Sequence, residues 1–141
     1  MDVAVVDASV AIKWTIEEDH SEEALRLASS ALLIAPRLML TECANILWRK
    51  SRLGQITADD AIAWHADLAL LPIDYLDDHA LLPEALALAV ALDHAIHDCL
   101  YAAASIQSGA PFVTADSRLY RKLVESRALR VAPVLLGELK V

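Results

Sequence analysis

The chain has 141 residues, of which 57% are hydrophobic, and its mean hydropathy of +0.41 indicates one domain, residues 1–141, with apolar surface left for a partner. Its formal net charge of -8 at pH 7 excludes indiscriminate binding to nucleic acid, because Lys and Arg supply most of the affinity for phosphates. No stretch reaches the roughly eighteen apolar residues of a membrane span, and the N-terminus carries no basic signal segment, so we expect a cytoplasmic protein without membrane contact.

The first part of the chain is predicted to contain a strand and two helices. Residues 3–6 form a continuous apolar run typical of a buried strand, and Ser9 is predicted to cap a short helix after it. Asp19 and Glu22 have the spacing of a capping box and predict a second helix. The inner face of that helix is expected to consist of Leu25, Ala28 and Leu32, before Pro36 breaks the pattern.

A helical hairpin is predicted next. Residues 38–52 are expected to form a long helix that ends at Gly54. Thr57 and Asp60 are expected to start a second helix with a single apolar stripe, so the two helices should pack side by side. A short strand around Ile73 follows.

The rest of the chain continues to alternate helices and strands. The expected elements are an apolar helix over residues 83–92, a helix that carries Asp98, a strand over residues 112–114, a helix capped by Asp116 or Ser117, and a last strand over residues 129–131. This alternation predicts an α/β fold, with an open, mostly parallel sheet flanked by helices on both faces.

Four acidic residues occur where such a fold brings distant segments together. Asp7 and Asp116 each follow a predicted strand, and the carboxyl ends of strands are where open parallel sheets bind ligands. Glu42 and Asp98 lie on predicted helices. Neighbouring carboxylates repel by about 4 kcal/mol at about 4 Å in a protein-like dielectric, unless a proton or cation is present. The four acids therefore predict a site for Mg²⁺ or Mn²⁺ and a metal-dependent phosphodiesterase.

Basic residues near two of these acids are candidates for contact with the nucleic acid. Arg49 shares a predicted helix face with Glu42, and the others follow Asp116 at a helix N-terminus, which itself favours a phosphate. For Arg49 the alternative is an ordinary complement of the helix dipole. The RNA-binding candidates are Arg49, Arg118, Arg121 and Lys122.

The cysteines and histidines add little chemistry of their own. Cys43 and Cys99 are interpreted as small buried hydrophobic residues rather than as a disulfide or a thiolate site. His94 lies four residues before Asp98 and is interpreted as a hydrogen-bonding residue rather than a catalytic base.

Four segments together resemble the signature segments of one family. VVDASV, TECANIL, HDCLYAAAS and VTADSRL occur in this order and look like those of the PIN domain, and the chain's length and register resemble VapC-type toxins of toxin–antitoxin pairs. The resemblance implies an endoribonuclease that depends on Mg²⁺ or Mn²⁺, cleaves RNA and is held inactive by a cognate antitoxin. It also implies a homodimer, and an antitoxin segment lying across the hairpin of residues 38–71.

The resemblance also assigns roles to single residues. It makes Asp7, Glu42, Asp98 and Asp116 the catalytic and metal-binding acids, and it makes Ser9, Asn45 and Thr114 the polar neighbours that orient them. Two positions depart from the family pattern. His97 precedes the third acid where an aromatic residue such as Tyr is usual, and Ala95 stands where Ser or Thr commonly caps the helix.

Two further functions remain open at this point. A catalytically degenerate PIN-like domain that only binds a partner would have the same sequence pattern. A receiver-like signalling domain would also hold Mg²⁺ among acids, but it needs an acceptor Asp at the end of a middle strand, and the segment LLIAP has none. With three glycines and no glycine-rich loop, a P-loop nucleotide enzyme is disfavoured.

Overall fold

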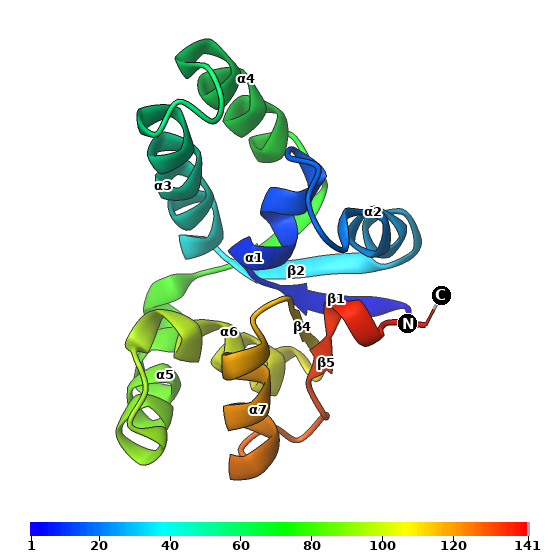
Figure 1. The fold of residues 1–141 in the computed structure, drawn as a ribbon. Coiled ribbons are helices and arrows are strands. Elements are labelled where there is room, and N and C mark those ends of the chain that lie inside the picture. Colours follow the sequence, from blue (N-terminus) through cyan, green and yellow to red (C-terminus); the bar gives the residue numbers. More distant parts are fainter. Residues whose placement is uncertain (141) are drawn as a thin grey trace.

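A parallel sheet of five strands forms the centre of the computed structural model, which describes residues 1–140 (Figure 1). The strands are β1 (Val3–Val6), β2 (Leu32–Pro36), β3 (Ile73–Leu76), β4 (Phe112–Thr114) and β5 (Val134–Leu135). Their order is β3-β2-β1-β4-β5, and each neighbouring pair is parallel. The central strand β1 is therefore covered on both faces, which explains its uninterrupted apolar sequence.

Helices cover both faces of this sheet. They are α1 (Ala8–Ala11), the 3-10 helix η1 (Ile12–Trp14), α2 (Ser21–Ser30), α3 (Leu38–Arg52), α4 (Ala58–Ala69), α5 (Asp78–Leu92), α6 (Ile96–Ser108), α7 (Ser117–Ser126) and the 3-10 helix η2 (Leu136–Glu138). In Figure 1, α1 to α4 lie on one side of the sheet and α5 to α7 on the other. The predicted α/β fold with an open parallel sheet is thus confirmed.

None of these helices, within residues 1–140, is long and apolar enough to cross a membrane alone; α5 and α6 pass such a test only as a pair bent by 117°.

The main core lies between β1, β4 and α6. Ala4, Val5 and Val6 of β1 are fully buried, and so is Phe112 of β4. The buried stretch of α6 includes three consecutive alanines, whose small side chains let this helix lie close to the sheet. The same helix carries Asp98, so the close packing of α6 fixes where this acid lies relative to the sheet.

A second, smaller core supports the hairpin of α3 and α4. It contains Ile12, Leu47 and Ala61, with Trp64 and Ile56 packed against them. The boundaries of this hairpin were predicted nearly correctly. Thr57 starts α4 as expected, because it accepts a hydrogen bond from the Asp60 backbone N–H at 3.0 Å. The hairpin extends away from the sheet, and its outer surface faces solvent (Figure 1).

The predicted starts of the first two helices are wrong. Asp7, not Ser9, caps α1. A capping box of Asp19 and Glu22 does not form, because α2 begins at Ser21 after His20, whose φ of 67° lies in the left-handed region. The spacing of Asp19 and Glu22 gave no sign of the tight turn at His20 before α2.

Two β-strand assignments also change. Leu32 is not part of the inner face of α2: it is 76% exposed and begins β2, which the sequence analysis missed. Leu25 is exposed as well, and the buried face of α2 is formed by Ala24 and Leu27. Residues 129–131 are not the last strand, which is Val134–Leu135. Helix α7 takes the chain about 15 Å from the sheet, so the residues after it are needed to return.

Candidate active site

Asp7 is the first residue after β1, and it is only 6% exposed. It accepts hydrogen bonds from the Ser9 hydroxyl at 2.5 Å, the Thr114 hydroxyl at 2.6 Å and the Val10 backbone N–H at 3.3 Å. Burial raises the pKa of Asp7 from 3.8 to about 6; the three donors lower the pKa, and the nearby Asp98 charge raises it. A cation beside Asp7 would stabilise a charge that burial alone disfavours.

Two hydroxyl groups join the ends of the neighbouring strands β1 and β4. Ser9 Oγ accepts a hydrogen bond from the Ala115 backbone N–H at 2.9 Å, and Thr114 Oγ1 accepts one from the Asp116 backbone N–H at 3.1 Å. Each hydroxyl donates to Asp7 and accepts from the backbone after β4. The position of Asp7 relative to Asp116 is therefore fixed by a network in which both hydroxyls are used.

Asp116 is the N-cap of α7 and is exposed to solvent. Its Oδ1 accepts hydrogen bonds from the backbone N–H groups of Arg118, at 3.0 Å, and Leu119, at 3.1 Å. Within residues 1–140, Oδ2 has no hydrogen-bond partner. One carboxylate oxygen thus orients the side chain, and the other is available to a ligand.

Glu42 reaches the site from α3 and is held by a residue of α6. The Tyr101 hydroxyl donates a hydrogen bond to Glu42 Oε1. The Tyr101 ring is buried and stacks on Phe112 with ring centroids 5.8 Å apart. Burial raises the pKa of Glu42, the Tyr101 hydroxyl lowers it, and Asp98 raises it. Burial also raises the pKa of Tyr101 far above its ordinary value, so this phenol stays protonated and keeps donating.

Asp98 lies in the first turn of α6 and is paired with His94, which precedes the helix. The His94 Nε2 and Asp98 Oδ2 atoms are 2.6 Å apart, and both side chains are partly buried. The spacing of four residues places the two side chains on one face, as the sequence suggested. Each of the two helical acids, Glu42 and Asp98, is therefore held by a protein partner.

All four predicted acids line one cavity of about 470 Å³. Its lining also includes Ser9, Asn45, Arg49, His97 and Tyr101. Carboxylate oxygens are the ligands that hard divalent cations prefer. Burial, and to a smaller extent the Asp98 charge, raise the pKa of Asp7 and of Glu42, and a cation would offset both effects. Within residues 1–140, no three His, Cys, Asp or Glu side chains are close enough to form a ready ligand set. The four acids thus share the lining of the cavity without forming such a set.

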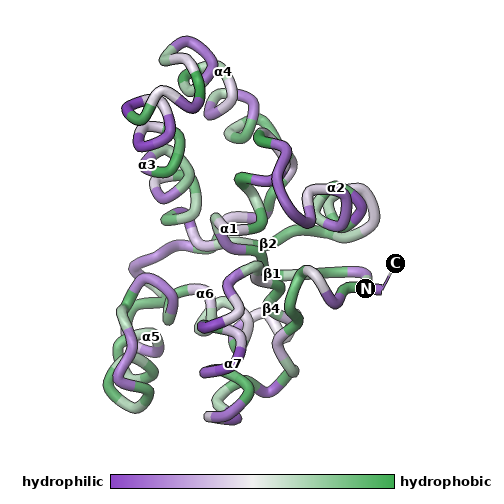
Figure 2. Tube along the Cα trace, in the orientation of Figure 1, coloured by the Kyte–Doolittle hydropathy of each residue, from purple (hydrophilic) through white to green (hydrophobic). Residues whose placement is uncertain are grey.

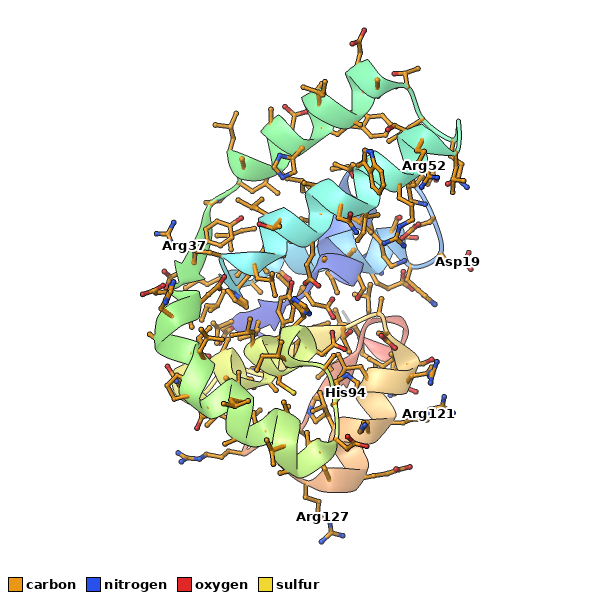
Figure 3. The ribbon with its side chains drawn as sticks, turned by 90° about the vertical axis from the view of Figure 1, so that its left-hand side faces the viewer. Asp19, Arg37, Arg52, His94, Arg121 and Arg127 are labelled. Carbon is orange, nitrogen blue, oxygen red and sulfur yellow. The ribbon has the colours of Figure 1, made fainter. Side chains whose placement is uncertain are left out.

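The basic candidates divide between this cavity and a neighbouring one. Arg49 lines the acidic cavity, whereas Arg118, Arg121 and Lys122 line a second cavity that adjoins it. Arg52, the last residue of α3, instead has its guanidinium carbon 5.6 Å from the centre of the Trp48 ring. Figure 3 shows Arg52 at the end of α3, away from His94 and Arg121.

A family model described as the PIN domain matches residues 4–123. The chain belongs to the PIN domain family. Among related proteins, Ribonuclease VapC3 of Pyrobaculum aerophilum is 32% identical over 124 residues, which cover 84% of this chain and 92% of the relative.

Solved structures share the fold of this PIN domain along nearly its whole length. PAE2754 from Pyrobaculum aerophilum has a TM-score of 0.70 and 24% identity, with 96% of this chain and 84% of that chain covered. VapC20 of Mycobacterium tuberculosis, described as a toxin that cleaves the sarcin-ricin loop, has a TM-score of 0.66 and 16% identity, with 92% and 99% covered. VapBC2 of Rickettsia felis, bound to a DNA fragment from its promoter, has a TM-score of 0.61 and 14% identity, with 94% and 96% covered.

The polar neighbours expected in this PIN domain differ in what they contact. Ser9 and Thr114 both bind Asp7 directly. Asn45 lines the cavity but makes no side-chain hydrogen bond within residues 1–140. Ala95 is the N-cap position of α6 and provides no side-chain cap, so α6 starts without the hydrogen bond that Ser or Thr would supply. His97 is exposed at the rim of the cavity.

Sequence reasoning missed the role of Tyr101. Tyr101 lies three residues after Asp98, and this spacing could have indicated that it lies near the site. Its hydrogen bond, however, is made to Glu42, which is 59 positions away on α3. Cys43 and Cys99 are free and buried, as predicted. Burial raises the pKa of the Cys43 thiol to about 12, so this cysteine is not a nucleophile in the PIN domain.

Proposed function

We propose that this chain is a divalent-metal-dependent endoribonuclease that acts in the cytoplasm as the toxin of a type II toxin–antitoxin pair. The observation that carries the proposal is that four carboxylates line one cavity, with Asp7 buried in its wall. The relationship to Ribonuclease VapC3 supports RNA as the substrate. Inhibition by a cognate antitoxin is part of the same proposal.

Each acid has a part in the proposed reaction. Asp7 and Asp116 would hold the ion most directly, with Glu42 and Asp98 as further ligands, direct or through water. Bound Mg²⁺ or Mn²⁺ would activate water and neutralise charge on the phosphodiester. Ser9 and Thr114 keep Asp7 oriented, and their hydroxyls are committed to it. The protein therefore needs no side-chain nucleophile for hydrolysis.

The alternative functions are weaker. The strand order β3-β2-β1-β4-β5 differs from the order 2-1-3-4-5 of receiver-like folds, which disfavours a signalling receiver. A degenerate domain that only binds a partner would have no reason to retain four carboxylates and a buried Asp7 in one cavity. The cleavage experiment described next distinguishes such a domain from an active nuclease.

Purified protein is expected to cleave single-stranded RNA with Mg²⁺ or Mn²⁺ and to stop in excess EDTA, because the carboxylates alone repel the phosphate. Cleavage is followed by gel electrophoresis of a labelled RNA. Recovery after added Mn²⁺ is the control that EDTA has not unfolded the protein. Undiminished cleavage in EDTA would contradict the metal mechanism, and no cleavage with either metal would favour the degenerate alternative.

Two separate apolar surfaces support two kinds of partner. A groove of about 410 Å³ between α3 and α4 is lined largely by apolar residues, including Leu47, Trp48 and Ile62. We infer that an antitoxin segment docks there; the net charge of -8 favours a basic segment.

The second apolar surface lies on α5. It contains the exposed residues Leu86 and Val90, and Figure 2 shows long hydrophobic stretches in this helix. We infer that it is the homodimer surface.

Ile62→Asp is expected to weaken antitoxin binding by about a hundredfold, because it removes an apolar side chain that the bound antitoxin would bury and places a charge in the groove. Ile62 is 71% exposed, so the fold should be retained, and RNA cleavage should be unchanged because the acidic cavity does not include it. Binding is measured by calorimetry with the purified cognate antitoxin.

Leu86→Glu is the matched control for this experiment. It changes an apolar residue of α5 that is 60% exposed, and it is expected to retain antitoxin binding while sedimentation shows a shift from dimer to monomer. If Leu86→Glu, rather than Ile62→Asp, removed antitoxin binding, the two surfaces would be assigned the wrong way round.

A further inference from the structure

A second cavity adjoins the acidic one and differs from it in charge. This α7 cavity has a volume of about 660 Å³ and shares Asp98 and Asp116 with the acidic cavity. Its other lining residues are His94, Ala95, Arg118, Leu119, Arg121, Lys122 and Glu125. A ligand in the acidic cavity can therefore continue into a neighbouring space that contains three cations.

The three cations lie on one face of α7. Arg121 and Lys122 follow Arg118 by three and four residues, so both are its neighbours on the helix surface, while Leu119 and Leu123 are buried. Lys122 Nζ donates to the Asp93 carbonyl oxygen at 2.9 Å, which holds it at the wall of the cavity. Arg121 Nε donates to the Ser117 carbonyl oxygen at 3.3 Å, which leaves its terminal nitrogens available.

These cations have no carboxylate partner of their own. Within residues 1–140, no ion pair includes Arg118, Arg121 or Lys122. Glu125 lines the same cavity one turn further along α7 and limits the positive region to its near end. Unpaired cations beside an acidic site are unusual in a protein of net charge -8, and their charge is free to act on a ligand.

The N-terminus of α7 offers fewer binding groups than its position suggests. The backbone N–H groups of Arg118 and Leu119, in the first turn of α7, are already bonded to Asp116 Oδ1. Side chains are therefore the main candidates for contact with a phosphate. They are also needed, because four carboxylates repel an RNA strand that enters their cavity.

We propose that the α7 cavity binds the RNA backbone phosphate next to the scissile one; this rests on the proposed function. Arg118, Arg121 and Lys122 contact that phosphate, while the scissile phosphate lies among the acids. Arg49 approaches the acids from α3, on the opposite side of the sheet, so the bound strand is held by cations on both sides. The three α7 cations thus set the affinity and register of the strand without taking part in hydrolysis.

The test compares RNA binding by two variants in an Asp7→Asn background, which prevents cleavage. Arg118→Gln/Arg121→Gln/Lys122→Gln is expected to weaken binding of a single-stranded RNA oligonucleotide about tenfold, and to reduce the slope of log K against log salt by about 0.7 for each lost contact. Fluorescence anisotropy over a range of KCl concentrations gives both values. In the protein with Asp7 restored, the triple variant should raise KM and change kcat little.

Arg127→Gln/Arg130→Gln is the matched control, because neither residue lines the α7 cavity and Arg127 projects from the far end of α7 in Figure 3. Its affinity should stay within about twofold of the parent. Unchanged affinity and salt slope in the triple variant, while the parent binds RNA, would overturn the α7 proposal alone. An equal loss in the control would also overturn it, since binding would then follow overall charge. Absence of RNA binding and cleavage in the parent would overturn the proposed function as well.

Discussion

RNA cleavage by the Asp7→Asn protein is expected to fall by about a thousandfold or more. Asp7 is the most buried of the four acids and lies in the wall of their cavity. An amide of the same size removes one ligand charge, and a metal ion contributes several kcal/mol to hydrolysis, where each 1.36 kcal/mol is about tenfold in rate. Cleavage of a labelled RNA at saturating Mn²⁺ measures the effect.

The same substitution is expected to leave the metal-free protein as stable as the wild type, or more stable, at pH 7.5. The pKa of Asp7 rises from 3.8 to about 6 on folding, so the folded protein binds more protons between these pH values. The free energy of unfolding of the wild type should therefore fall as pH rises through this window and level off above it, by about 3 kcal/mol in all. Asp7→Asn should lack this contribution and keep only the smaller fall that the raised pKa of Glu42 causes.

Urea unfolding at pH 4, 5, 6 and 7.5 in EDTA compares the two proteins. The new amide cannot accept from both hydroxyls as the carboxylate does, which offsets part of the gain. A large loss of stability in Asp7→Asn at pH 7.5 would mean that the Asp7 charge holds the fold together, contrary to the role argued here.

Thr114→Val is expected to lower both stability and RNA cleavage. Thr114 is fully buried, donates to Asp7 Oδ2 at 2.6 Å and accepts from the Asp116 backbone N–H at 3.1 Å. Valine has the same shape but no hydroxyl, so the buried Asp7 Oδ2 and the part-buried Asp116 backbone N–H both lose this partner. The expected cost is about 1–3 kcal/mol in the free energy of unfolding. Cleavage should fall about 10- to 100-fold, as for residues that orient a ligand.

Thr114→Ser separates the hydroxyl from the methyl group. It keeps both hydrogen bonds and loses one methyl, so cleavage should stay close to that of the wild type while stability falls slightly. Denaturant unfolding and RNA cleavage are measured on both variants. The argument fails if Thr114→Ser loses as much activity as Thr114→Val, because packing rather than hydrogen bonding would then be responsible.

The sequence predicted those elements whose signals are local. Residues 3–6 and 112–114 were assigned as strands because an uninterrupted apolar run is typical of a strand covered on both faces. The α3 and α4 boundaries followed from a capping Thr and a terminal Gly. The strand β2 was missed because Leu32 continues the helical spacing of α2, and only pairing with β1 decides that it is a strand.

For the site, the four acids were found from strand ends and from a family resemblance, but their contacts were not. The hydrogen bond from Tyr101 to Glu42 links α6 to α3, and the sequence contains no sign of which residue on another helix it will meet. The pairing of His94 with Asp98 was visible in their spacing of four residues, whereas the distances among the four acids are a tertiary result.

The place of β1 in the sheet has a consequence for the order in which the protein is synthesised. Asp7 leaves the ribosome before Thr114, which donates to it, and before Ala115, whose backbone N–H donates to Ser9; both follow more than a hundred residues later. Until β4 has been translated and has paired with β1, the nascent chain contains Asp7 but not the residues of β4 that hold it. A fragment that ends before β4 cannot assemble the cavity, so a cell translating this gene makes no active nuclease until the ribosome has passed Asp116.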